Sequence, residues 1–266
     1  MPGEPGAGSW RFRLGTLDWQ CKLRADMEVR SRLIGRMYPI PPVWLEGRAW
    51  LEYAQLLRSP VYAGVDVPPG DGRPVMLIPG FLAGDSSLDV LRAWLRHNGY
   101  RPLRSGINLN VFASEALVAR IASRLGHEYR KNGRKVTIIG QSRGGVLALG
   151  LQHRYPRMVE RVISLGSPIN DPLDVHPSTM AAVHVVRALH TLRRGPRNVD
   201  ARFDAELAEP VKVPFTSLYS KSDGIVHWEA CLRPDVEAVE VGGSHVGMGV
   251  NVRVYKQLAR LLARAG

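Results

Sequence analysis

The segment Gly140-Gln141-Ser142-Arg143-Gly144 has the residue types and spacing that could activate a serine for nucleophilic attack. It fits the pattern G-x-S-x-G and lies directly after the apolar run 136–139 and directly before a predicted helix. In a turn of this kind the glycines let backbone segments approach closely, so the serine hydroxyl is exposed. The helix N-terminus favours negative charge that develops nearby. The pattern therefore predicts Ser142 as a nucleophile.

A serine nucleophile needs a base, and His245 is the histidine best placed for that role. It lies in a loop of small residues, 242–247, after a predicted strand and just before the last helix. The other histidines lie in or beside predicted helices or loops in arginine-rich surroundings, and we expect them to be surface or core residues: His97, His127, His153, His176, His184, His190 and His227. Chain order supports His245, because a nucleophilic serine on a strand-to-helix turn of this kind is followed along the chain first by its acid, an aspartate, and then by its histidine.

The base needs a carboxylate that orients it, and Asp223 is the candidate. It follows the predicted strand 213–219 and stands between Ser142 and His245 in the chain. Asp-Gly is also a common turn dipeptide, so Asp223 could have only a structural role in a turn. Asp235 and Glu229 are the alternatives, but neither follows the end of a strand, where the ligand crevices of α/β sheets open.

An oxyanion formed at Ser142 needs two hydrogen-bond donors. The first is expected to be the backbone N–H of Arg143. The second should come from the loop 79–84, with the N–H of Phe81 preferred and that of Leu82 as the second choice. Three side chains beside these groups are predicted to contact the substrate: Leu82, Gln141 and Val246.

Strand and helix patterns alternate from residue 74 onward. Strands are expected at 75–78, 101–108, 136–139, 159–165, 213–219 and 236–241, and helices at 86–98, 114–131, 144–154 and 250–264. This alternation predicts an α/β fold with a mostly parallel central sheet and helices on both faces. We expect an N-terminal helical arm over residues 1–70 and the α/β domain over 71–266, which a lid or cap insertion interrupts at 169–212.

Two helical segments allow two interpretations each. The helix predicted over 44–57 could pack on the body, which its mixed charges favour, or could contact a membrane surface or line an acyl channel through Trp44 and Trp50. The helix predicted over 178–192 has a broad apolar surface. That surface could cover the serine as a lid and bind acyl chains, or could pack on the body.

Composition excludes several classes of protein. The 266 residues are 45% hydrophobic and 23% charged, which is typical of a globular chain. The net charge of +12 does not indicate nucleic acid, because no basic run alternates with aromatic residues, and the bias to arginine (30 of the 36 basic residues) is typical of GC-rich coding. Two distant cysteines, Cys21 and Cys231, give no disulfide framework. Since the first residues lack the pattern of a secretory signal, we expect a cytoplasmic protein.

The motifs around Ser142, Asp223, His245 and the 79–84 loop together resemble those of the α/β-hydrolase superfamily, and more narrowly those of bacterial lipases and esterases. The resemblance extends over residues 74–264. It implies hydrolysis of carboxylic esters, with a lipid-like or otherwise apolar acyl group, and it implies neither a metal nor a cofactor. Two residues depart from the usual pattern. Pro79 stands where many lipases have a histidine, and Arg143 stands where a neutral residue is more usual; its side chain could steer an anionic substrate or pair with a carboxylate.

Three alternatives remain from the sequence. The same residues could transfer the acyl group to another acceptor, as in an acyltransferase or thioesterase. The chain could also be a non-catalytic member of the fold that binds a lipid or a partner. A basic face could contact an anionic membrane surface.

Overall fold

Six short runs of residues form the strands of one parallel sheet. The computed structural model describes residues 40–194 and 200–264, and Ile40–Gly266 forms one unit of the chain, separate from Met1–Pro39. The sheet has the order β2-β1-β3-β4-β5-β6, and all its neighbouring strands are parallel. The strands are β1 Pro74–Ile78, β2 Arg101–Arg104, β3 Val136–Gln141, β4 Val159–Leu165, β5 Phe215–Tyr219 and β6 Glu237–Glu240.

The apolar runs are continuous because the central strands are buried on both faces. In β1 the side chains alternate between two clusters, with Val75 and Leu77 in one cluster and Met76 and Ile78 in the other. A strand that is covered on both faces needs an apolar residue at every position, which is the pattern that the sequence carries.

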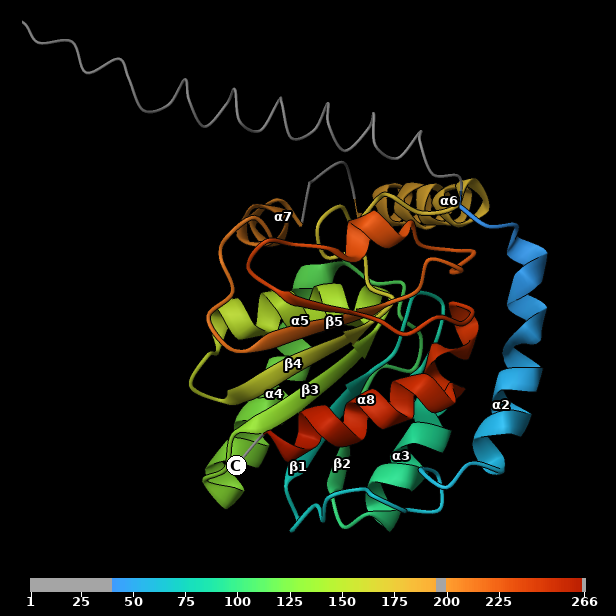
Figure 1. Ribbon diagram of the computed structural model, residues 1–266. Coiled ribbons are helices and arrows are strands. Elements are labelled where there is room, and N and C mark those ends of the chain that lie inside the picture. The colour runs from blue at the N-terminus through green and yellow to red at the C-terminus, as the bar shows by residue number, and fades with distance from the viewer. Residues whose placement is uncertain (1–39, 195–199, 265–266) are drawn as a thin grey trace, which may run out of the picture. The chain divides into compact units, whose positions relative to one another are not determined.

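Helices cover both faces of the sheet (Figure 1). The cluster on one face includes residues of α2 (Ala49–Leu57), α3 (Asp89–His97) and α8 (Val252–Ala263). The cluster on the other face includes residues of α4 (Ser114–Asn132), α5 (Arg143–Arg154) and α7 (Ala201–Glu206). The described elements also include short 3-10 segments: η1 Val43–Arg48, η2 Asp85–Leu88, η3 Trp228–Cys231 and η4 Val246–Val250.

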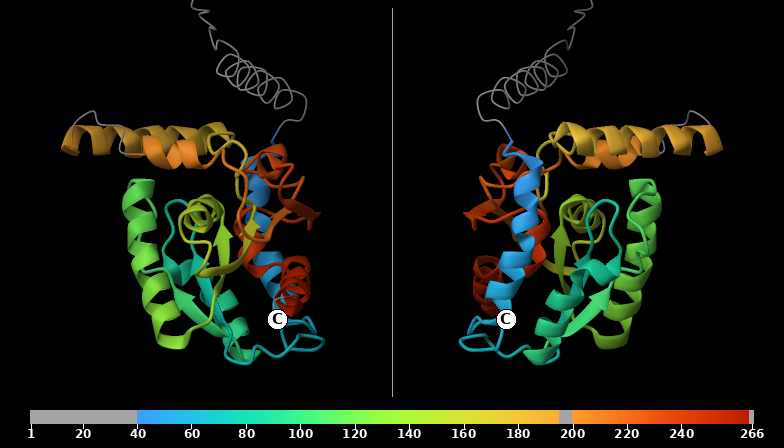
Figure 2. Two further views of the ribbon diagram at one scale, coloured as in Figure 1. Left: turned by 90° about the vertical axis from the view of Figure 1, so that its left-hand side faces the viewer. Right: turned by 90° about the vertical axis from the view of Figure 1, so that its right-hand side faces the viewer.

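The insertion after β4 carries two helices, α6 (Pro177–Arg194) and α7, which lie across the top of both views in Figure 2. Phe203 of α7 is buried against α5, where a Cβ added at Gly150 would lie 2.3 Å from its ring. In contrast, α6 exposes Val185 and Leu189. The sequence pattern predicts the first helix and misses the second, because a helix of six residues is too short for periodicity to reveal.

Several predicted boundaries differ from those of the structure. The helix expected over 44–57 is divided into η1 and α2. The strand expected over 101–108 ends at Arg104, because the backbone then turns and both Ser105 and Gly106 donate hydrogen bonds to the Asp85 carboxylate. The helix α4 begins at Ser114, as predicted, and continues to Asn132; the Ser114 hydroxyl accepts a hydrogen bond from Arg143.

Among the described residues, no helix combines the length and the apolar character needed to cross a bilayer. The cytoplasmic location, the boundary at residue 70 and the lid role of 169–212 stay predictions.

Trp94 on α3 is the largest fully buried side chain among the described residues, and its indole N–H donates a 2.8 Å hydrogen bond to the Val61 carbonyl. Its ring also packs 4.9 Å from that of Tyr255 on α8. We predict that Trp94→Ala lowers the free energy of unfolding by about 3–5 kcal/mol, measured by chemical denaturation. Trp50→Ala is the control, because that indole is 78% exposed, and its effect should stay within about 0.5 kcal/mol. Equal losses in the two variants would contradict this description of the core.

Candidate active site

Ser142 lies in a strained turn between β3 and α5. Its backbone has φ 52° and ψ −125°, a conformation that residues other than glycine rarely adopt. The turn requires close backbone contacts, since a Cβ added at Gly140 would lie 2.5 Å from Gly144, and one at Gly144 would lie 2.2 Å from the Ile78 carbonyl oxygen. The Ser142 N–H donates a 2.8 Å hydrogen bond to Leu165 of β4, which fixes the turn at the end of the sheet.

Asp223 and His245 are in direct contact. Nδ1 of His245 lies 2.7 Å from Oδ2 of Asp223, and both side chains are buried. The other oxygen, Oδ1, accepts 2.8 Å hydrogen bonds from the backbone N–H groups of Ile225 and Val226. These bonds fix the orientation of the carboxylate, which can then select the imidazole tautomer that carries its proton on Nδ1.

The surroundings of His245 stabilise its charged form. Burial alone would lower the pKa of this imidazole, because it disfavours the imidazolium. The Asp223 carboxylate opposes burial through its charge and its hydrogen bond, and the Glu46 carboxylate adds a further negative charge. As a result, the pKa of His245 lies above its ordinary value of 6.5.

Two contacts bring the loops of His245 and Asp223 to the ends of β3 and β4. The side-chain amide of Gln141, which precedes Ser142, donates a 3.2 Å hydrogen bond to the His245 carbonyl. A Cβ added at Gly166, directly after β4, would lie 3.1 Å from Oδ2 of Asp223. The residues predicted to act together thus gather at the carboxyl edge of the sheet, where α/β folds bind their ligands.

The loop that follows β1 lies against Ser142. A Cβ added at Gly80 would lie 3.1 Å from the Ser142 Cβ. Leu82 has φ 59°, and its N–H donates to the Asn110 carbonyl at 3.2 Å, so this group is already engaged. None of the described residues accepts a hydrogen bond from the Phe81 N–H. Phe81 is therefore the better of the two predicted donors, beside the Arg143 N–H at the start of α5.

Asn110, which sequence reasoning missed, connects that loop with α5. It is fully buried, its Nδ2 donates to the Pro79 carbonyl at 2.8 Å, and its Oδ1 accepts from the Arg143 guanidinium at 2.8 Å. The same guanidinium donates to the Phe112 carbonyl at 2.7 Å. Through these hydrogen bonds, the Arg143 side chain holds the 110–114 segment in place. A single asparagine after a weak strand gives no sequence signal for this role.

A second group that sequence reasoning missed comes from η1 and α2, which lie beside the His245 loop (Figure 1). Glu46 accepts hydrogen bonds from the N–H groups of Gly224, His245 and Val246. Glu52, buried on α2, accepts a 2.8 Å hydrogen bond from the Ser244 N–H. Its second oxygen accepts from the Asn251 side chain, and Arg48 donates to the Ser222 carbonyl. In the sequence, nothing distinguishes Glu46, Arg48 and Glu52 from the other charged residues of a predicted amphipathic helix.

The alternative acids have other partners. Asp235 pairs with Arg233 at 3.0 Å and accepts a hydrogen bond from the Val211 N–H. Glu229 lies 2.8 Å from the buried imidazole of His227. Neither carboxylate contacts His245. Within the described chain, no cluster of three or more His, Cys, Asp or Glu side chains is arranged to hold a metal ion.

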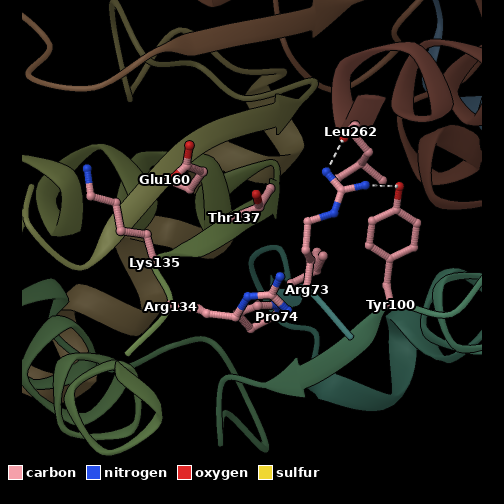
Figure 3. Close-up of a pocket in the computed structure, with 9 residues that line it drawn as sticks. Arg73, Pro74, Tyr100, Arg134, Lys135, Thr137, Glu160 and Leu262 are labelled. Carbon is pink, nitrogen blue, oxygen red and sulfur yellow. Dashed lines mark hydrogen bonds between the residues drawn. The ribbon is translucent and has the colours of Figure 1, made fainter. Parts of the chain in front are cut away.

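A cavity of about 260 Å³ lies at the opposite end of the sheet, where β1 and β3 begin (Figure 3). Arg73 and Tyr100 line it, and Arg73 donates a 2.8 Å hydrogen bond to the Leu262 carbonyl and a 3.3 Å bond to the Tyr100 hydroxyl. Because Ser142 follows the other end of β3, this cavity is not part of the candidate active site.

Asn110→Ala should weaken the fold locally. The substitution removes a buried partner from both the Pro79 carbonyl and the Arg143 guanidinium, so we predict a loss of about 1–3 kcal/mol in the free energy of unfolding, measured by denaturant titration. Asn108→Ala provides the control in the same loop, because Asn108 is exposed and should change stability by less than about 0.5 kcal/mol. A neutral Asn110→Ala would mean that the described contacts do not hold the loop.

Comparisons with known proteins agree with this architecture. A family model described as "Putative esterase" matches residues 109–218, which include Ser142. No curated protein sequence matches the chain. A mature lipase from Bacillus licheniformis is 19% identical, with a TM-score of 0.56 over 73% of this chain and 94% of the lipase.

Two other solved structures are similar. A monoacylglycerol lipase from Paleococcus ferrophilus is 17% identical, with a TM-score of 0.54 over 75% of this chain and 97% of that enzyme. An α/β hydrolase from a lagoon-sediment metagenome is 18% identical, with a TM-score of 0.51 over 74% of this chain and 91% of its own. With the parallel sheet and the turn at its edge, these similarities show that the chain has the α/β-hydrolase fold.

Proposed function

We propose that this chain is a serine hydrolase that cleaves carboxylic esters. The contact that carries the proposal is the 2.7 Å pair of His245 and Asp223 at the sheet edge that also holds the strained Ser142 turn. The match to the esterase family model and the likeness to lipase structures support ester hydrolysis as the reaction class.

Ser142 Oγ attacks the ester carbonyl carbon, and His245 takes the hydroxyl proton. Asp223 holds the imidazole tautomer and stabilises the imidazolium. The N–H groups of Arg143 and Phe81 bind the tetrahedral oxyanion. As the carbon–oxygen bond breaks, His245 gives its proton to the leaving alcohol, and the acyl group remains on Ser142. Water then attacks the acyl-enzyme by the same steps, which release the carboxylic acid and restore the serine.

Apolar acyl groups are the proposed substrates. Leu82 and Val246, which lie beside the proposed oxyanion donor and the proposed base, are 52% and 58% exposed. Leu109 and Phe112, which flank Asn110, are each 44% exposed. These side chains offer an apolar surface on the loops around Ser142. The exposed apolar residues of α6 support a lid role for the 169–212 insertion, which would cover the acyl chain.

Reaction with a fluorophosphonate ester tests the nucleophile. Attack by Ser142 Oγ on phosphorus expels fluoride, so intact-mass spectrometry should record one adduct on the wild type and none on Ser142→Ala. The same variant should lower ester hydrolysis by about 10⁵–10⁶-fold. A folded wild type that forms no adduct would favour a non-catalytic binding protein instead. Product analysis with added alcohols or thiols would separate hydrolysis from acyl transfer.

A series of p-nitrophenyl esters tests the substrate class. We expect kcat/KM to rise about threefold to fourfold for each CH₂ that the protein buries, up to a limit set by its acyl site. Leu82→Asn should flatten this dependence, because asparagine tolerates the positive φ but removes apolar surface. Leu57→Asn, at an exposed leucine of α2, is the matched control and should leave the dependence unchanged. A wild type indifferent to chain length would refute an apolar acyl site.

A further inference from the structure

The loops that carry Asp223 and His245 are joined by one carboxylate from a distant part of the chain. Oε1 of Glu46 accepts hydrogen bonds from the Gly224 N–H at 2.8 Å and from the His245 N–H at 3.0 Å. Its Oε2 accepts from the Val246 N–H at 2.7 Å. Gly224 directly follows Asp223, so a single oxygen fixes the backbone beside the acid and the backbone of the histidine itself.

The surrounding residues are adapted to this carboxylate and to its neighbour Glu52. A Cβ added at Gly224 would lie 2.9 Å from Oε1 of Glu46, and one at Gly247 would lie 2.0 Å from Oε2 of Glu52. Side chains are therefore excluded where the two carboxylates approach the loops. Backbone N–H groups that point at a carboxylate form charge-assisted hydrogen bonds, which are stronger and more directional than neutral ones.

We propose that Glu46 is a positioning residue, which acts through His245 and Asp223 by holding their two loops in register for proton transfer. The inference rests on the proposed function, since it assigns η1 to the same site. It also gives the segment after residue 40 a role other than packing. Ester hydrolysis depends steeply on the geometry of acid and base, and displacement of a catalytic group by about 1 Å can cost roughly 100-fold in rate.

The charge of Glu46 also bears on the histidine. The ionisable groups around the His245 loop come from η1 and α2, from the loop after β5 and from α8: Glu46, Arg48, Glu52, Asp223 and Arg253. Among them, Asp223 and Glu46 raise the pKa of His245. The base must be neutral to act, so the rate rises with pH as the imidazolium loses its proton. The raised pKa shifts this rise to higher pH.

The test is the pH dependence of fluorophosphonate labelling in Glu46→Gln. The amide keeps one acceptor oxygen but points an NH₂ group at the Val246 N–H or at the Gly224 and His245 N–H groups, so at least one of the three hydrogen bonds is lost together with one negative charge. We expect the plateau rate to fall roughly tenfold. We also expect the acid limb to shift to lower pH by about half a unit to one unit, because the imidazolium loses a stabilising charge.

Asp66→Asn is the matched control. It removes one negative charge from an exposed residue, and asparagine tolerates the positive φ at this position. Neither the acid limb nor the plateau of the labelling profile should move. Glu46→Asp keeps the charge with a shorter reach, so its plateau should fall while its limb stays closer to that of the wild type. Thermal melting of each variant establishes that it is folded.

Two results would overturn the positioning role. One is a Glu46→Gln profile that coincides with the wild type. The other is a uniform loss at all pH values with an unmoved limb and a lowered melting temperature, which would mean that Glu46 only supports the fold. A wild type that does not react at any pH would instead refute the proposed function, and the positioning role with it, before any variant is compared.

Discussion

The close approach of three backbone segments at Ser142 is the constraint on which the rest of the site depends. β3 must turn into α5 within a few residues, and it does so against the end of β1, so Gly140 and Gly144 have no room for a side chain. The turn holds Ser142 at φ 52°, in a region that costs on the order of 1–3 kcal/mol for such a residue. The packing of the buried sheet offsets this cost and fixes the position of the serine.

Around that fixed point, the other groups lie on loops, and each loop is held by a polar contact from elsewhere. Asn110 holds the loop after β1, and Glu46 holds the loops after β5 and β6. The serine and the loops are held in different ways for a physical reason. The sheet edge is rigid, whereas the loops have backbone N–H and C=O groups that need hydrogen-bond partners. Carboxylate and amide side chains provide those partners.

The sequence predicts the parts of this arrangement that depend on local pattern. Apolar runs identify the central strands, the alternation of strand and helix patterns indicates β2 and β6, and small residues around Ser142 and His245 identify two of the turns. Asp223 could be chosen because it follows a strand and lies between the other two in the chain. Glu46 and Asn110 could not be found in this way, because their partners are distant in sequence and neither has a characteristic neighbour pattern. The short α7 and the division of the 44–57 helix depend on packing and on these same distant contacts.

The hydrogen bonds of Glu46 to His245 and Val246 join residues that are 199 and 200 positions apart. During synthesis, the segment before β1 leaves the ribosome long before its partners have been made. It cannot complete these contacts until residues 245 and 246 have been made, and loop closure over this distance is among the slower events of folding. The nascent chain can therefore pass through states in which much of the sheet forms while the Asp223 and His245 loops lack their contacts with Glu46. Such an order means that the turn at Ser142 can form before the His245 loop is in place.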